Sequence, residues 1–360
     1  MLAARARGDA SLSVEAPSRR VGRRGNGHAA AFYRHRPPWW SGADASPEAG
    51  GALAPSAWDD GDGMVAVQAV PPPFTPLRLI TGWALAPVPM ALIILTGFLY
   101  WSGLRRLGRV GKGPAWPTSR TWAFFGGLVV TVVALLSPVD TYADVSFSVH
   151  MLQHVLLMMV AAPLFALGAP VTLALRASRA ETRRRILLPI LHSRAVAFLT
   201  HPLVAFSLFA VAQYVSHFTG FYQAALRSSP VHYVEHAVFL VTALLFWWPV
   251  VGLDPAPRKL SHPARLLYLV AAMPMEAFLA VALLSSRPYA AYASLPAPWG
   301  GAAAVADQSN AAAVMWIAGD LTMLVAALLA AGAWMRREQV RQRRIEEEED
   351  RRTGLAVAPP

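Results

Sequence analysis

Seven apolar runs, each close to twenty residues long, divide this chain and constrain its fold more than any other feature. A helix needs about 20 apolar residues to cross the hydrocarbon core of a bilayer. Only 15% of the residues are charged, and most of these charges lie between the runs. The sequence therefore predicts an all-α integral membrane protein, a bundle of seven transmembrane helices. The predicted spans are 79–99, with any bend at its two prolines, then 121–136, 145–167, 195–218, 231–251, 266–285 and 311–334.

The segments outside these runs differ in composition from the predicted bundle. Residues 1–75 are rich in Arg, Gly, Ala, Pro and Asp and lack apolar periodicity, which predicts a disordered extension. No apolar core follows the early arginines, so no signal peptide is expected there, and Met64 is an alternative translation start. Residues 76–335 form the predicted membrane domain, and 336–360 a charged cytoplasmic tail.

The charges between the runs predict the orientation, because Lys and Arg are enriched in short cytoplasmic loops. Basic residues gather after the first, third, fifth and seventh runs, whereas the alternate loops hold only Arg227 and Arg287. The N-terminus is therefore predicted outside and the C-terminus in the cytoplasm. The same loops explain the net charge of +11, so the lipid bilayer is expected as a partner and nucleic acid is not.

Two pairs of histidines, each spaced four residues apart, fall in the outer parts of predicted spans. His150 and His154 lie in the third span, and His232 and His236 lie in the fifth. His217 ends the fourth span at the same level. Residues four apart share one helix face, and ionisable side chains inside a span usually face the protein interior. We expect all five to converge on one metal site.

Further side chains are predicted to support this site or line its entrance. Asp307 and Gln308 precede the seventh span and would line the entrance. Glu276 and Asp320 would lie below, tuning the imidazoles or accepting protons released when metal binds. Glu235 either orients a ligand from behind or faces water. The full set is Glu235, Glu276, Asp307, Gln308, Met315 and Asp320.

The chain contains no cysteine, which excludes disulfides and thiolate metal sites. Imidazole pairs with optional thioethers suit copper, and suit haem iron or zinc less selectively. Met158 and Met159 are interpreted as packing residues, because methionine in a membrane helix is usually filler. The sequence shows no nucleophile with its base, no P-loop and no phosphate cradle, so the chain is not expected to be an enzyme.

Three blocks of sequence resemble, in order, the multi-spanning CtaG family of cytochrome c oxidase assembly factors. The first is His150-Met-Leu-Gln-His154 followed by Ala162 to Pro170. The second is His232-Tyr-Val-Glu-His236 followed by Phe246-Trp-Trp-Pro249, and the third is Asp307-Gln308 followed by Met315-Trp316. The resemblance covers residues 78–335. It departs at the long N-terminal extension and at Asn310-Ala-Ala-Ala, where the family pattern has a glycine-containing stretch.

This resemblance implies a multi-pass protein of the bacterial plasma membrane that helps to mature a caa-type haem–copper oxidase. It implies copper delivery, with an oxidase subunit or a copper chaperone as partner. An unrelated single-span copper chaperone that shares the family's name uses cysteines, and the absence of cysteine rules out that homology.

Two other functions remain open at this point. A haem-binding protein, serving as electron carrier or haem-delivery factor, would need the histidine pairs to face each other across a haem-sized gap. A proton-coupled transporter would need a polar path to the cytoplasm, which the apolar stretch 155–160 disfavours. The metal hypothesis requires that His232 and His236 point at His150 and His154.

Overall fold

A computed structural model describes residues 71–83, 86–110 and 114–353. Every regular element within these ranges is a helix, which confirms the predicted all-α class. Most of the N-terminal extension, including Met64, lies outside the described residues. The same is true of the last residues of the charged tail, 354–360.

Long helical segments occupy all the predicted spans. They are α2 (Pro87–Val110), α3 (Thr118–Leu136), the run α5 (Phe147–Val155), η1 (Leu156–Ala161) and α6 (Ala162–Leu167), then α11 (Pro202–Phe218), α13 (Ser229–Val251), α14 (His262–Leu284) and α16 (Ala302–Thr353). The shorter elements are α1 (Arg78–Thr81), α4 (Pro138–Ala143), α7 (Pro170–Ala177), α8 (Ala180–Thr182), η2 (Arg183–Leu187), α9 (Leu188–Leu191), α10 (Arg194–Leu199), α12 (Phe221–Arg227) and α15 (Ala290–Ala293).

Six helices of the described chain are long and apolar enough to cross a membrane. The fourth predicted span is the exception, because α11 has only 17 residues. It reaches the length of a span only together with α12, which follows after a bend of 70°. The predicted count of seven therefore depends on treating this bent pair as one span.

Two of the spans begin later than the apolar pattern predicts, and each begins at a proline. The first span was expected at 79–99 with a bend at its prolines, but α2 begins at Pro87 and continues to Val110. The fourth was expected from residue 195, but α11 begins at Pro202. Proline has no N–H to donate and a fixed φ, which suits the first turn of a helix better than its interior.

The last span and the charged tail form one helix. The apolar run predicts 311–334, whereas α16 runs from Ala302 to Thr353. The tail, for which sequence left helix or coil open, is helical as far as it is described. Its residues 336–351 are exposed, so it leaves the bundle as a solvated extension.

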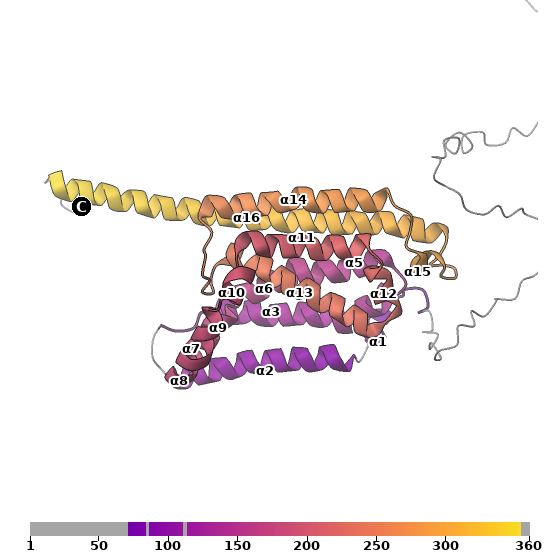
Figure 1. Cartoon of the computed structure of the whole chain (residues 1–360), viewed down its shortest axis with the longest axis horizontal. Helices are drawn as coiled ribbons and strands as arrows, with labels where there is room; N and C mark the ends of the chain where they lie inside the picture. Colours follow the sequence, from indigo (N-terminus) through magenta and orange to yellow (C-terminus); the bar gives the residue numbers. More distant parts are fainter. Residues whose placement is uncertain (1–70, 84–85, 111–113, 354–360) are drawn as a thin grey trace, which may run out of the picture. The chain divides into compact units, whose positions relative to one another are not determined.

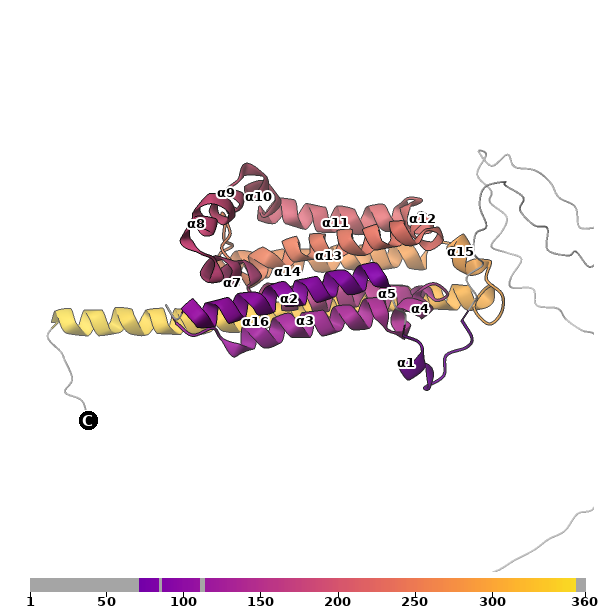
Figure 2. The same ribbon diagram turned by 90° about the horizontal axis from the view of Figure 1, so that it is seen from below.

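The long helices lie side by side and roughly parallel or antiparallel (Figure 1). In this bundle α16 packs along α14 and α5, and α13 packs between α11 and α6. The short helices α4, α12 and α15 gather at one end, here called the α12 end (Figure 2). Helices α7 to α10 gather at the opposite end, here called the α8 end, where the exposed part of α16 also projects.

A core of large apolar side chains fills the bundle toward the α8 end. Phe209, Phe246 and Trp247 are almost fully buried there, together with residues of η1, α14 and α16. The Trp247 indole Nε1 donates to the Met158 carbonyl at 2.9 Å, where the π-helical turns of η1 interrupt the ordinary pattern. By contrast, α2 exposes a row of apolar side chains, as expected of a helix that faces lipid. These include Leu92, Ile94, Leu95, Phe98 and Leu99.

Candidate metal centre

The two histidine pairs face each other inside the bundle. His150 and His154 come from α5, and His232 and His236 come from α13. The ring centroids of His150 and His232 are 5.0 Å apart, and those of His154 and His236 are 5.7 Å apart. None of the four side chains is more than 9% exposed. The structure thus meets the geometric condition that the sequence set.

Three potential ligand atoms lie at distances close to those within a metal coordination shell. The Nε2 atoms of His150 and His154 are 3.0 Å apart, and the Glu235 Oε2 atom lies 3.7 Å and 4.0 Å from them. Two nitrogens bound tetrahedrally at about 2.0 Å would be about 3.3 Å apart. A second group of His150, His232 and His236 also offers ligand atoms within 4.8 Å of one another. His150 belongs to both groups.

Glu235 points into the centre rather than into water, which resolves what the sequence left open. Its side chain is fully buried. Oε1 accepts a hydrogen bond from the Ser216 hydroxyl at 2.6 Å, whereas Oε2 has no hydrogen-bond partner among the described residues. An unsatisfied buried carboxylate oxygen is costly, so a cation beside it would be stabilising.

Two tyrosines that the sequence analysis did not single out hold His150 in one tautomer. The Tyr292 hydroxyl donates to the Ala143 carbonyl at 2.8 Å and lies 2.9 Å from the Tyr222 hydroxyl. It also lies 3.3 Å from His150 Nδ1. Because its own proton is committed, Tyr292 can only accept from this nitrogen. His150 is therefore protonated at Nδ1, which leaves the Nε2 lone pair available to a metal.

Gln153 orients the opposite pair, and it too was missed as a site residue. Its amide nitrogen donates to the Ala134 carbonyl at 2.8 Å and to Asp140 Oδ1 at 2.7 Å. Its Oε1 therefore accepts from His236 Nε2, 3.2 Å away. The sequence spacing could have identified Gln153 as a site residue, because it lies three residues after His150 and shares its helix face.

The pattern His-x-x-Gln/Glu-His occurs on both α5 and α13, and the Gln or Glu of each helix approaches histidines of the other. Gln153, on α5, contacts a histidine of α13, and Glu235, on α13, approaches both histidines of α5. Each motif thus supplies two imidazoles and one polar side chain that positions or complements the imidazoles of the other helix. Partners of this kind fix ring orientation and tune ligand strength in metal sites.

Asp140, which lies outside the spans, accepts a hydrogen bond from Gln153. Its buried carboxyl group should make the stability of the protein depend on pH. Burial raises the pKa of its carboxyl from 3.8 to about 6, even though the Gln153 hydrogen bond lowers it. The folded protein then binds more protons than the unfolded chain between these values, so stability falls as pH rises through this window. Asp140→Asn should remove an effect on the order of 3 kcal/mol. Unfolding temperatures of wild type and variant in detergent, compared at acidic and neutral pH, test this; parallel pH profiles would contradict it.

The structure places His217 beside the centre rather than among its ligand groups. Its Nδ1 lies 2.8 Å from the Gln213 carbonyl, and its Nε2 lies 3.4 Å from the Met151 sulfur. Its ring stacks on that of Tyr222. Although it is buried at the expected level, it belongs to neither of the two groups of ligand atoms.

Asp307 and Gln308, which the sequence predicts at the entrance, make hydrogen bonds between helices that the sequence analysis did not anticipate. Asp307 accepts hydrogen bonds from the Phe147 and Ser148 backbone N–H groups, at 2.5 Å and 3.3 Å, and so caps the start of α5. Gln308 is buried and donates to the carbonyls of Leu283 and Ser286 at the end of α14. Both tie α16 to a neighbouring helix, and Asp307 thereby positions the helix that carries His150 and His154.

The two deeper carboxylates, Glu276 and Asp320, lie in different surroundings. Glu276 is 1% exposed and accepts a hydrogen bond from the Gln213 amide at 2.8 Å. It lines a small cavity next to the centre, together with His154 and Met315. Asp320 instead accepts from the exposed Trp316 indole at 2.8 Å. Of the two carboxylates predicted below the histidines, only Glu276 is therefore positioned to act with them.

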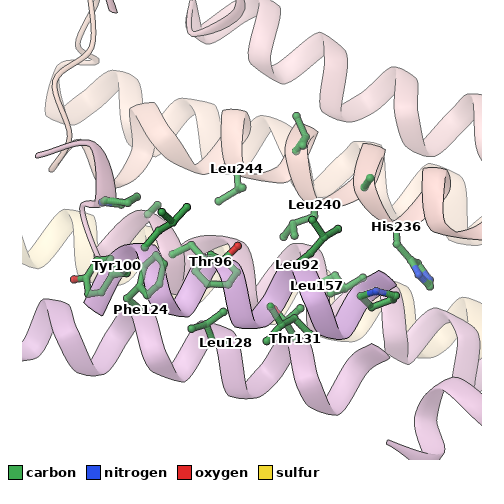
Figure 3. A pocket seen from close by; sticks show the side chains of 18 of the residues that line it. Leu92, Thr96, Tyr100, Phe124, Leu128, Thr131, Leu157, His236, Leu240 and Leu244 are labelled. Carbon is green, nitrogen blue, oxygen red and sulfur yellow. The ribbon is translucent and has the colours of Figure 1, made fainter. Parts of the chain in front are cut away.

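An apolar groove of about 590 Å³ adjoins the centre on another side (Figure 3). It is lined mainly by aliphatic and aromatic side chains of α2, α3 and α13, including Leu92, Leu128 and Leu240, and His236 lies at its edge. The centre is thus bounded on this side by a surface suited to hydrocarbon and not by a polar channel.

The arrangement offers the kinds of side chain that could hold a cation. It offers four imidazoles and a carboxylate in a buried space and has no cysteine. The buried atoms His154 Nδ1, His232 Nε2 and Glu235 Oε2 have no hydrogen-bond partner in the part of the chain that is described. Each such atom costs about 1–3 kcal/mol when left unsatisfied, which favours occupation by a ligand.

Comparison with known proteins identifies one family. The model of the cytochrome c oxidase caa3 assembly factors matches residues 98–337. Uncharacterised proteins of Mycobacterium bovis and Mycobacterium tuberculosis are each 33% identical over 291 residues, which cover 78% of this chain and 43% of theirs. One of Mycobacterium leprae is 34% identical over 298 residues, 80% of this chain and 44% of its own. The chain thus spans less than half the length of these relatives. No solved structure matches it.

Proposed function

The chain belongs to the family of cytochrome c oxidase caa3 assembly factors, and we propose that it delivers copper to such an oxidase. The copper is cargo, held in transit by the His-rich centre on the extracytoplasmic side of the membrane. The receiver is an oxidase subunit, or a copper chaperone acts as an intermediate partner.

One observation carries this proposal, namely the convergence of His150, His154, His232, His236 and Glu235 in a buried space. Imidazole ligands without thiolate suit copper among the metals available to cells. In a centre that releases its cargo, the ligands must keep their positions after the metal has left, so neighbouring side chains must hold them in place. The hydrogen bonds of Tyr292 and Gln153 supply that support.

The proposed orientation rests on the two ends of the bundle. The α8 end carries a dense set of arginines, which favours the cytoplasmic side. The histidines lie within the first eight residues of α5 and α13, and the first turns of both helices lie toward the α12 end (Figure 1). The centre would therefore open outward, in a bacterial plasma membrane, with the C-terminal extension of α16 in the cytoplasm. The arginines are Arg176, Arg179, Arg183, Arg184, Arg185 and Arg194.

Two features of the bundle weigh against haem binding and proton-coupled transport. The rings of His150 and His232 are in direct contact, which leaves no width for a macrocycle between the pairs. A proton path toward the α8 end would have to pass Phe239, Phe246 and Trp247, which are buried in an apolar core. Both features favour a single ion over haem or a proton relay.

Oxidase maturation in cells tests the function. In a bacterium that makes a caa3-type oxidase but lacks this protein, we expect the purified oxidase to have lost at least about tenfold in copper content and activity. Wild type and the exposed-site control His192→Ala should restore both, and the double variant His154→Ala, His236→Ala should not. Added copper should partly rescue the double variant. Full oxidase activity with the double variant, at equal membrane levels, would reject copper delivery through this centre.

A further inference from the structure

A small cavity beneath the histidine pairs is unusually rich in thioether sulfur. Its lining includes four of the chain's eleven methionines, and its volume is about 20 Å³. A single water or ion needs at least about 10–15 Å³ measured in this way. The sequence analysis interpreted Met158 and Met159 as packing residues, but both are buried against this cavity. The four methionines are Met151, Met158, Met159 and Met315.

One contact in the cavity wall is hard to explain as packing alone. His217 Nδ1 lies 2.8 Å from the Gln213 carbonyl, which can only accept, so Nδ1 carries the proton. The Nε2 lone pair then faces the Met151 sulfur at 3.4 Å. A thioether cannot donate a hydrogen bond, so two electron-rich atoms face each other, and a soft cation between them would satisfy both.

The distance between these two atoms suits a shared ion. A tetrahedral ion bound to nitrogen at about 2.0 Å and to sulfur at about 2.3 Å would hold them about 3.5 Å apart. The 3.4 Å between His217 Nε2 and Met151 Sδ is close to this value. Thioether ligands select copper(I) over harder divalent ions.

A buried carboxyl group completes the cavity. Glu276 lines it, and its Oε2 has no hydrogen-bond partner in the described structure, although Oε1 accepts from Gln213. The side chain is 1% exposed, so a carboxylate here would complement one positive charge. His154 belongs to both the cavity wall and the histidine centre, which makes the two spaces neighbours.

We propose that this cavity, built around Met151, His217, Met315 and Glu276, is a second metal site that takes copper(I), distinct from the histidine centre. It rests on the proposed function in that copper is the cargo. An ion that leaves the imidazoles can pass to the thioethers through His154, so copper(I) is retained inside the bundle until a partner accepts it.

Copper(I) loading of the full-length protein in detergent, without oxygen, tests the site by uptake and X-ray absorption. Wild type should bind two ions per chain, one with nitrogen and oxygen neighbours only and one with sulfur neighbours as well. The variant Met151→Leu, Met315→Leu, which conserves side-chain volume, should fall to one ion and lose the sulfur signal. The control Met90→Leu, Met335→Leu should behave as wild type, because neither residue lines the cavity.

The outcomes separate this inference from the proposed function. The variant His150→Ala should lose the ion without sulfur neighbours and keep the other. Unchanged uptake and sulfur scattering in the methionine variant would overturn the second site, as would a wild type with nitrogen and oxygen neighbours only, in which the cavity holds water. A wild type that binds only the sulfur-coordinated ion would support the cavity site and refute the histidine centre.

Discussion

Replacing His150 with alanine is expected to lower the copper affinity of the histidine centre by at least about 100-fold. This residue belongs to both groups of possible ligand atoms, so its replacement removes a ligand atom from each group. Its Nε2 lies 3.0 Å from His154 Nε2 and 3.7 Å from Glu235 Oε2.

Competition with a chelator of known affinity measures this effect on the purified protein. His192→Ala is the matched control, because that histidine is exposed on the protein surface. Unfolding temperatures should show that the His150 variant is folded. An affinity within about threefold of wild type, which is less than 1 kcal/mol, would mean that His150 is not a ligand.

Neutralising Glu235 is expected to produce the second large effect. Glu235→Gln keeps the size of the side chain and an oxygen that can accept from Ser216, but it removes the negative charge. In a buried site a carboxylate stabilises a cation far more than it would in water. We therefore expect copper affinity to fall by about 10–100-fold.

Two further variants serve as comparisons for the copper affinity of Glu235→Gln. Ser216→Ala removes only the 2.6 Å hydrogen bond that holds Glu235 and should weaken binding less than the charge substitution does. Glu338→Gln removes an exposed glutamate on α16 and should leave affinity unchanged. Equal affinities for Glu235→Gln and Glu338→Gln would show that the buried charge does not face the metal.

Much of this centre could be predicted because two local rules act together. Spacing by four residues puts His150 with His154, and His232 with His236, on one helix face each. The high cost of burying imidazole in a span then indicates that both faces turn inward. Since the third and fifth spans run in the same direction, the loop charges put both pairs at one level. These constraints do not by themselves bring α5 and α13 together, and the facing of the two pairs comes from the structure.

What the sequence left unresolved depends on contacts between distant residues. Asp307 is predicted at the entrance because it precedes a span, and its position gives no sign that it caps a helix 160 positions earlier in the chain. Tyr292 lies on the four-residue helix α15, where no periodic pattern exists to show which way a side chain points. The helix starts at Pro87 and Pro202 were misplaced because hydropathy continues across both prolines, whereas backbone hydrogen bonding does not.

The copper content of purified protein is the most direct test of the central claim. Wild-type protein, extracted in mild detergent from cells grown with copper, should retain a copper ion that has only nitrogen and oxygen neighbours, and it should show no haem absorption band. The double variant His154→Ala, His236→Ala should have lost that nitrogen-bound copper, while His192→Ala retains it. Equal nitrogen-bound copper in wild type and the double variant would contradict the assignment of the two histidine pairs as the metal centre.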